Sequence, residues 1–201
     1  MEKLSDIAQI RAGFPFRGKI PEGEQHFVVQ MKNISLDGEI AWQACDKTNI
    51  EKSHTDWLED GDILLSAKGE RNYAVLVKNV EKQKAVASPH LFVMRVKHHN
   101  VLPAFLVWLL NQRVVQKYFE QNAEGSGMKN IRRPILENTP VIIPSLQKQQ
   151  TIVALAHNLK QQRKLLEKLM ATEEQMMIGI ARSIREEQKY TKWSNEEIDT
   201  V

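Results

Sequence analysis

Cysteine is almost absent from the sequence, with Cys45 its single representative among 201 residues. One thiol excludes an internal disulfide and a four-thiolate metal site within one chain. A lone cysteine is most simply a small buried hydrophobic side chain in a reducing compartment. The N-terminus carries acidic residues and no apolar segment of the kind that a signal peptide needs. The most apolar stretch, 101–110, is too short to cross a bilayer and contains Pro103. We therefore predict a cytoplasmic protein with no membrane partner.

Motifs of catalysis and cofactor binding are also lacking. The glycine-rich phosphate-binding patterns GxGxxG and GxxxxGK are absent, and so is the zinc-binding pattern HExxH. His98 and His99 stand at the end of a predicted strand, where an exposed turn is a simpler interpretation than a metal site. We therefore predict that the chain is not an enzyme and holds no metal and no cofactor.

Charge is unevenly distributed along the chain. Residues 1–62 hold seven Lys/Arg and twelve Asp/Glu, a balance of −5, and residues 63–145 hold twelve and five, a balance of +7. Residues 146–201 hold nine and eight, a balance of +1. A concentrated positive segment is what a phosphate-binding face requires, and the alternative is a set of scattered, solvated lysines.

Residues 1–144 have the pattern of a mixed α+β domain with short strands and a few helices. One helix is predicted from Pro103 to about Glu120, because proline suits a first turn and apolar residues recur at helical spacing. A glycine pair at 125 and 127 then breaks the chain. Runs rich in β-branched and aromatic residues predict strands at 26–31, 62–67, 73–77, 91–96 and 140–143.

The character of the sequence changes after Pro144. Residues 145–187 contain no proline and a single glycine, so we predict one long helix there, followed by a polar tail at 188–201. Heptads read from Ile152 place apolar residues at seven of ten a and d positions, a coiled-coil pattern. The alternative is a helix folded back over the globular domain. The predicted seam contains Ile152, Leu155, Leu159, Gln162, Leu166, Leu169, Glu173, Met176, Ile180 and Ser183.

An antiparallel pairing of two such helices accounts for both strongly polar seam positions. When paired residue numbers sum to 335, Gln162 faces Glu173 and an amide donor meets a carboxylate. A parallel pairing would set Glu173 against its own copy, a like-charge contact. We therefore predict a homodimer, although a partner chain's helix is an alternative occupant of the seam.

Several segments, in their chain order, resemble the specificity subunit of type I restriction–modification systems. The opening KLSDIA leading to Gly13 is similar to the family's start, and VQMKNISLDGEI at 29–40 is similar to its strand-and-turn signature. GDILLS at 61–66 is the most recognisable piece. The segment 125–159 is similar to the family's join between recognition domain and spacer helix, through Ile143-Pro144 and a group of glutamines. The resemblance covers about residues 1–185.

The resemblance implies a target-recognition domain at 1–144 and a spacer helix at 145–187. It further implies that the chain reads double-stranded DNA and scaffolds adenine-methyltransferase subunits, with ATP-driven cleavage belonging to a restriction subunit. Two features depart from the family's pattern. The residues after Pro144 lack the usual second proline and Glu-Gln pair, and complete specificity subunits have two recognition domains and two spacer helices, where this chain has one of each.

Two loops combine the groups that phosphates and base edges require, which are cations, amides and glycines that let a backbone come close. Gln30, Lys32 and Asn33 form a lower-ranked third group, and ordinary solvated turns are the alternative for all of them. In the loops, the candidate DNA-binding residues are Lys68, Arg71, Asn72, Lys129, Asn130, Arg132 and Arg133.

Two other functions remain open from sequence. One is a stand-alone DNA-binding regulator or another defence component that reuses a recognition domain. The other is a coiled-coil adaptor without DNA affinity.

Overall fold

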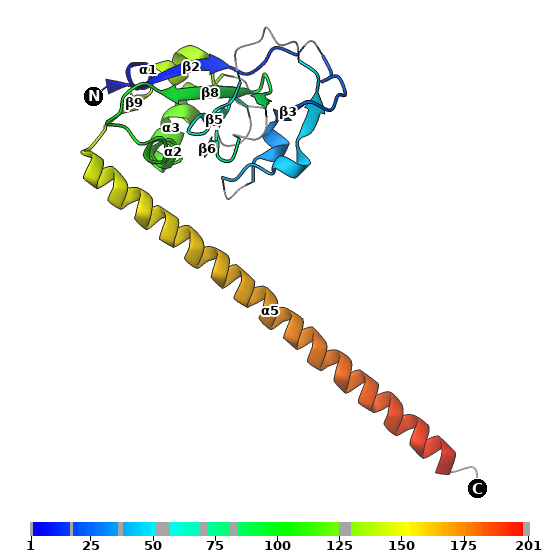
Figure 1. The fold of residues 1–201 in the computed structure, drawn as a ribbon. Coiled ribbons are helices and arrows are strands. Elements are labelled where there is room, and N and C mark those ends of the chain that lie inside the picture. The colour runs from blue at the N-terminus through cyan, green and yellow to red at the C-terminus, as the bar shows by residue number, and fades with distance from the viewer. Residues whose placement is uncertain are drawn as a thin grey trace. The chain divides into compact units, whose positions relative to one another are not determined.

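The computed structural model describes residues 2–16, 18–35, 38–50, 57–68, 72–80, 84–124 and 130–198, with side chains described as far as 186. The chain divides into two compact units, Met1–Leu155 and Ala156–Val201. Figure 1 shows the course of the chain in each unit. The first unit mixes strands and helices, and a long helix follows it, so the predicted α+β class with a long C-terminal helix is confirmed.

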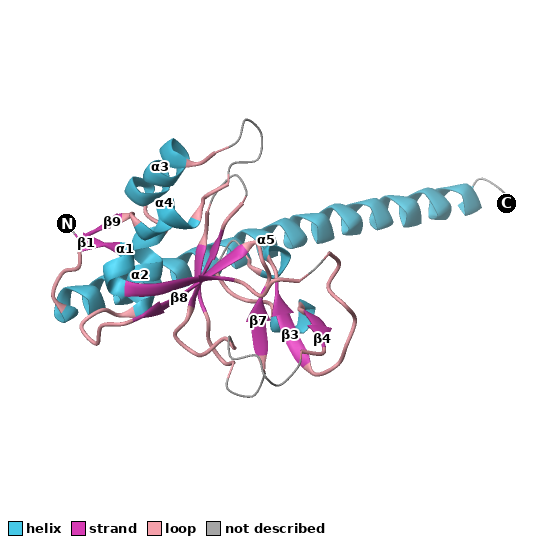
Figure 2. Cartoon of the chain, turned by 90° about the horizontal axis from the view of Figure 1, so that it is seen from above, coloured by secondary structure: helices cyan, strands magenta, loops and turns pink. Residues whose placement is uncertain are grey.

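Two sheets form the centre of the first unit. The larger is antiparallel, in the order β2 (Ala8–Ala12), β8 (Leu91–Val96), β5 (Ile63–Ser66) and β6 (Ala74–Leu76). The smaller has the order β4 (Asp46–Thr48), β3 (His26–Val29) and β7 (Ala85–Ala87), with β3 antiparallel to β4 and parallel to β7. Figure 2 shows the smaller sheet with its three strands side by side. A third, short pair joins β1 (Glu2–Lys3) to β9 (Pro140–Val141).

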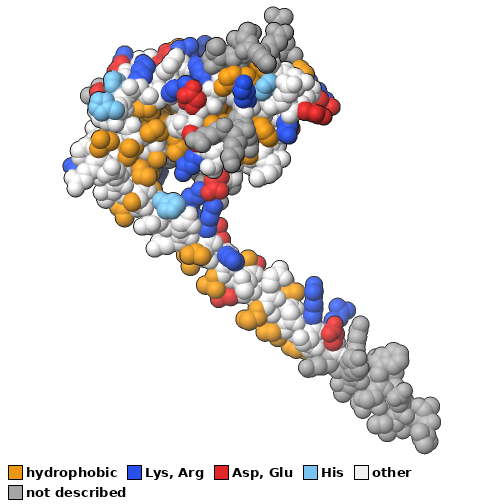
Figure 3. Space-filling view, in the orientation of Figure 1, with side chains coloured by type: hydrophobic (Ala, Val, Ile, Leu, Met, Phe, Trp, Pro, Cys, Tyr) orange, Lys and Arg blue, Asp and Glu red, His pale blue; other side chains and the backbone are white. Residues whose placement is uncertain are grey.

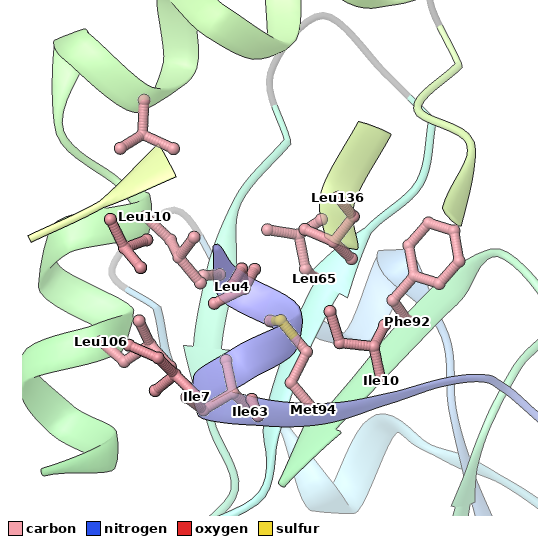
Figure 4. Close-up of a cluster of buried hydrophobic side chains, with 14 of the residues drawn as sticks. Leu4, Ile7, Ile10, Ile63, Leu65, Phe92, Met94, Leu106, Leu110 and Leu136 are labelled. Atoms are coloured by element: carbon pink, nitrogen blue, oxygen red, sulfur yellow. The ribbon is translucent and has the colours of Figure 1, made fainter. Parts of the chain in front are cut away.

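Helices cover one face of the larger sheet, and the smaller sheet covers the other. Side chains alternate along each strand, so Ile63 and Leu65 of β5 enter the cluster shared with the helices, and Leu64 enters the cluster shared with the smaller sheet. Figure 4 shows Ile63 and Leu65 in one cluster with the helical side chains Leu106 and Leu136. The covering helices are α1 (Leu4–Ile7), α2 (Pro103–Leu110), α3 (Arg113–Asn122) and α4 (Arg133–Glu137), and single 3-10 turns lie at Met31–Asn33 and Trp42–Ala44.

The single helix predicted over 103–120 is wrong in one respect, because the structure breaks it into α2 and α3. The break lies at Asn111, whose side-chain amide accepts from the backbone N–H of Ala74 at 2.9 Å and donates to the Ala74 carbonyl at 2.8 Å. The Asn111 side chain thus pairs with the backbone N–H and carbonyl of Ala74 at the start of β6, as the backbone of a neighbouring strand would. Gln116 then donates to the carbonyl of Leu110, an acceptor left free where α2 ends. The chain therefore turns a corner at a point where hydrophobic spacing alone predicts continuity.

The GDILLS motif anchors β5 within the fold. Asp62 is buried, and both of its carboxylate oxygens accept hydrogen bonds from Arg95 of β8, at 2.7 and 2.8 Å. These bonds, followed by the charges of Asp62 and Glu59, raise the pKa of the Arg95 guanidinium above its usual range. Gly61, with φ of +93°, makes the preceding turn in a conformation that favours glycine. The motif therefore has a structural role.

A buried glutamine fixes the start of the long helix α5 (Leu146–Ile198). The Gln149 amide nitrogen donates to the carbonyls of Asn100 and Pro144, each at 2.8 Å, and its oxygen accepts from the N–H of Leu102 at 2.8 Å. All of its hydrogen-bonding groups are therefore satisfied. At its other end, α5 continues to Ile198 and includes most of the predicted polar tail. No proline or glycine follows Gly179 to stop it.

Candidate nucleic-acid interface

The described ends of the two loops that the sequence singled out lie side by side. Lys68 forms an antiparallel bridge with Asn130, and the N–H of Ile131 donates to the carbonyl of Ala67 at 2.8 Å. Asn130 also exchanges two backbone hydrogen bonds with Glu124, at 3.0 and 3.1 Å. We call residues 67–72 and 124–133 the paired loops. Segments nearly sixty residues apart in sequence thus share one surface.

Predicted contact residues differ in how the structure presents them. Lys68 and Asn130 are half-buried in the bridge, whereas Arg71 and Lys129 lie outside the described residues. Asn72 is only 5% exposed, and its amide donates to the carbonyl of Ser66 at 2.7 Å. Because that side chain shapes the loop from inside, its place in the candidate site is structural support.

Arg132 and Arg133 are exposed and carry carboxylate partners. Arg132 pairs with Glu124 at 2.5 Å, and Arg133 pairs with Glu137 at 2.7 Å. The two arginine side chains are 66% and 56% exposed. Exposed ion pairs contribute about 0–1 kcal/mol, so a phosphate can replace the carboxylate at little cost. Both arginines are therefore available to an anionic ligand that competes with their present partners.

Helix α3 connects the paired loops. Near its beginning, Gln116 donates to the carbonyl of Asn72 at 2.9 Å, and after its end the chain reaches Glu124 in the second loop. Its exposed cations, Arg113 and Lys117, were missed by the loop-based prediction. The sequence did contain a pattern that indicates them, because two basic residues four positions apart share one face of a helix.

The third group predicted from sequence uses its polar side chains within the protein. Lys32 and Gln30 both donate to the Asp46 carboxylate, at 2.9 and 2.5 Å, and the Lys32 bond, followed by that of Gln30, lowers the pKa of Asp46. Asn33 is buried and donates to the carbonyl of Ala44 at 2.7 Å.

Burial, reinforced by the neighbouring Asp46 charge, raises the pKa of the Cys45 thiol to about 11. Cys45 is therefore protonated at neutral pH and is a poor nucleophile.

Helix α5 exposes a long apolar stripe. The predicted seam residues Leu155, Leu159, Leu166, Leu169, Met176 and Ile180 are between 46% and 66% exposed, and Ile152 is half-buried. Hydrophobic side chains recur along the helix in Figure 3. In the heptad numbering, Met170, Met177 and Ile184 occupy e positions and widen the stripe.

Along the described part of the chain, no helix combines the length and apolar character that a membrane span needs.

Comparisons with known proteins relate this architecture to restriction systems. No curated protein matches the sequence. Solved structures with a similar fold include three chains of which this chain spans less than half the length. A structure from a study of complex assembly and conformational transition of the type I R-M system has a TM-score of 0.59 at 18% identity, over 86% of this chain and 40% of that one.

Two specificity subunits have similar folds. The HsdS subunit from Thermoanaerobacter tengcongensis has a TM-score of 0.64 at 17% identity, over 85% of this chain and 44% of that one. The S subunit of M. genitalium has a TM-score of 0.53 at 14% identity, over 84% and 40%. The family model for the type I restriction modification DNA specificity domain matches residues 1–172. Because this match covers most of the sequence, the chain belongs to the family of type I restriction modification DNA specificity domains.

Proposed function

We propose that this protein is the non-catalytic DNA-recognition subunit of a type I restriction–modification complex. The observation that carries the proposal is the joining of the paired loops into one surface through Lys68, Asn130 and Ile131. This surface bears the exposed cations Arg132 and Arg133, which can exchange carboxylate for phosphate. DNA as the partner also accounts for the predicted cytoplasmic location.

The apolar stripe of α5 supports the proposed assembly. Ile152–Ser183 paired antiparallel with the same segment of a second copy would overlap for about 48 Å, at about 1.5 Å per residue. The dimer would then hold two recognition domains and bind a bipartite site. A two-helix seam covers the a and d positions, so Met170, Met177 and Ile184 leave an apolar row for a helix of a modification subunit. A restriction subunit would join through that assembly.

The test is the salt dependence of DNA binding. Arg132→Ala with Arg133→Ala should weaken binding to a short random-sequence duplex and lower the slope of log K against log salt by up to about 1.8, since each lost phosphate contact removes about 0.9. The matched control is Lys78→Ala with Lys84→Ala, which removes the same charge. Both lysines are exposed and flank the β6–β7 connection, at the far end of β6 from the paired loops.

Binding by the wild-type chain with equal slopes for the arginine variant and the control would remove the second loop from the interface. A wild-type chain that does not bind duplex DNA even at low salt would refute the proposed function.

A further inference from the structure

A cleft opens on the first unit beside the paired loops. Its volume is about 900 Å³, and it lies between Tyr73, which follows the first loop, and the exposed face of α3. Arg113, Val114 and Lys117 line the helical side. Because Tyr73 adjoins Asn72, the cleft begins where the first of the paired loops ends.

The polar wall of this cleft is held rigidly by the fold. Asn111 lines it and makes two hydrogen bonds with the backbone of Ala74. Gln116 also lines it and donates to the carbonyls of Asn72 and Leu110, at 2.9 and 2.8 Å. The amide groups that line the cleft are therefore occupied by backbone partners. What remains for a ligand is the set of charged and apolar groups that α3 presents.

The two cations of the cleft differ from Arg132 and Arg133 in their partners. The side chains of Arg113 and Lys117 are exposed, and neither makes a hydrogen bond or ion pair with a described residue. By contrast, Arg132 and Arg133 each bind a carboxylate of the chain itself. An anion at Arg113 and Lys117 therefore has no such internal carboxylate to displace.

The same pair is unfavourable to the isolated helix. Like charges four residues apart on a helix cost about 0.2–0.5 kcal/mol. Glu120 also lines the cleft, yet it forms no ion pair with either cation among the described residues. A bound anion would remove the repulsion between Arg113 and Lys117. Functional sites often contain a local arrangement that the fold itself does not stabilise and that a bound ligand would stabilise.

We propose that Arg113 and Lys117 bind the sugar–phosphate backbone of the DNA strand whose bases face the first of the paired loops. This inference rests on the proposed function and adds a contact surface to it. Val114, 82% exposed beside the two cations, would lie against a deoxyribose or a thymine methyl group. The ten-residue helix is about 15 Å long, at about 1.5 Å per residue, so it would follow the backbone from one loop toward the other.

The position of the cleft favours DNA over an acidic protein surface. Its wall includes Tyr73 and is braced on Asn72, so it is continuous with a loop whose chemistry suits base edges. Phosphate contacts fix the register of a protein on the duplex, and such contacts commonly flank the groups that read bases. An acidic partner protein at the same place is an alternative that the experiment distinguishes.

The experiment uses a double variant of the full chain that carries both Arg113→Ala and Lys117→Ala. Its control is the double variant that carries both Lys78→Ala and Lys84→Ala. Binding to a short random-sequence duplex is measured between about 50 and 200 mM salt. Loss of two phosphate contacts should lower the slope by about 1.8, which makes the fall in affinity over that fourfold range roughly twelvefold smaller than for wild type. Arg113→Lys with Lys117→Arg should keep the wild-type slope.

A second substitution tests the cleft without removing a cation. Val114→Glu places a carboxylate at an exposed helical position, so it should weaken DNA binding while thermal unfolding stays unchanged. Val114→Gln has a side chain of the size of glutamate without its charge, and it should bind more tightly than Val114→Glu.

The outcomes separate this inference from the proposed function. If wild type binds DNA and the alanine variant keeps the slope of the control, the cleft is not a phosphate site and the proposed function stands. The same variant losing a modification subunit while keeping DNA would identify a protein-docking surface and overturn the inference. If wild type fails to bind duplex DNA, both proposals fall.

Discussion

Polar side chains in the first unit divide into those bound within the fold and those left for a ligand. Asp62, Asn111 and Gln149 each satisfy several hydrogen-bonding groups internally, and they fix a strand, a helix break and a helix start. Arg113 and Lys117 have no such partner among the described residues. The residue type alone does not distinguish the two classes, since Asn72, which was predicted to touch DNA, is buried and donates to the carbonyl of Ser66.

Gly13 illustrates a requirement for space at the scale of one atom. A Cβ at this position would lie 2.0 Å from the carbonyl oxygen of Ser88, well inside van der Waals contact. Gly13→Ala therefore forces the β2 end away from the turn before β8, and it should destabilise the first unit by about 2–3 kcal/mol, near the upper range for overpacking. Urea unfolding followed by tryptophan fluorescence would measure the loss.

The matched substitution is Gly179→Ala, where an added Cβ meets nothing within 4 Å. Alanine should stabilise that part of α5 by about 0.5–1 kcal/mol, because glycine is unfavourable within a helix. Equal stability of the Gly13→Ala variant and wild type would show that the turn at Ser88 yields freely.

At the scale of elements, the sequence predicted strands where hydrophobic runs are long and missed them where they are short or polar. The runs at 63–66 and 91–96 form β5 and β8, the buried centre of the larger sheet. The strand β4, with sequence Asp-Lys-Thr, has no alternating pattern and exists because it pairs with β3. The break between α2 and α3 depends on Asn111 meeting Ala74, a contact 37 residues away that no local pattern contains.

The candidate site was predictable to a similar extent. Glycines and basic residues indicated both loops, and their adjacency came from the bridge of Lys68 with Asn130. Arg113 and Lys117 were passed over because they lie on a helix, and they gain significance only from the neighbouring Tyr73 and from their lack of described carboxylate partners.

Helix α5 gives a prediction about its own pairing. In the register where residue numbers sum to 335, Leu166 faces Leu169 at the centre of the seam, and Gln162 faces Glu173. Leu166→Asp would place two carboxylates among leucines and should abolish the dimer. Glu173→Lys should weaken it only slightly, because lysine faces the amide oxygen of Gln162. Light scattering at rising protein concentration would measure both effects.

A wild-type chain that remains monomeric at high micromolar concentration would contradict self-pairing. The exposed stripe would then belong to a helix supplied by a partner subunit. Equal dimerisation of the Leu166→Asp variant and wild type would place the interface elsewhere on the chain.

At the scale of the whole molecule, the proposed dimer determines how many recognition surfaces meet the DNA. The three similar solved structures are chains more than twice as long as the segment they share with this one. Dimerisation through α5 would give this protein two recognition surfaces related by a two-fold axis. A complex with that symmetry reads the same half-site twice, in opposite orientations.

The consequence is a specific form of target sequence. Selection of bound duplexes from a randomised library by wild-type protein should enrich two copies of one short sequence, inverted and separated by a gap of constant length. We expect one gap length because the proposed helical pair has a single register, in which Leu166 faces Leu169. The Leu166→Asp variant should enrich a single copy with lower affinity, since it keeps the recognition domain and loses the second surface. Two unrelated half-sites from purified wild-type protein would mean that identical domains do not read the site, and that the dimer proposed here is not the DNA-binding species.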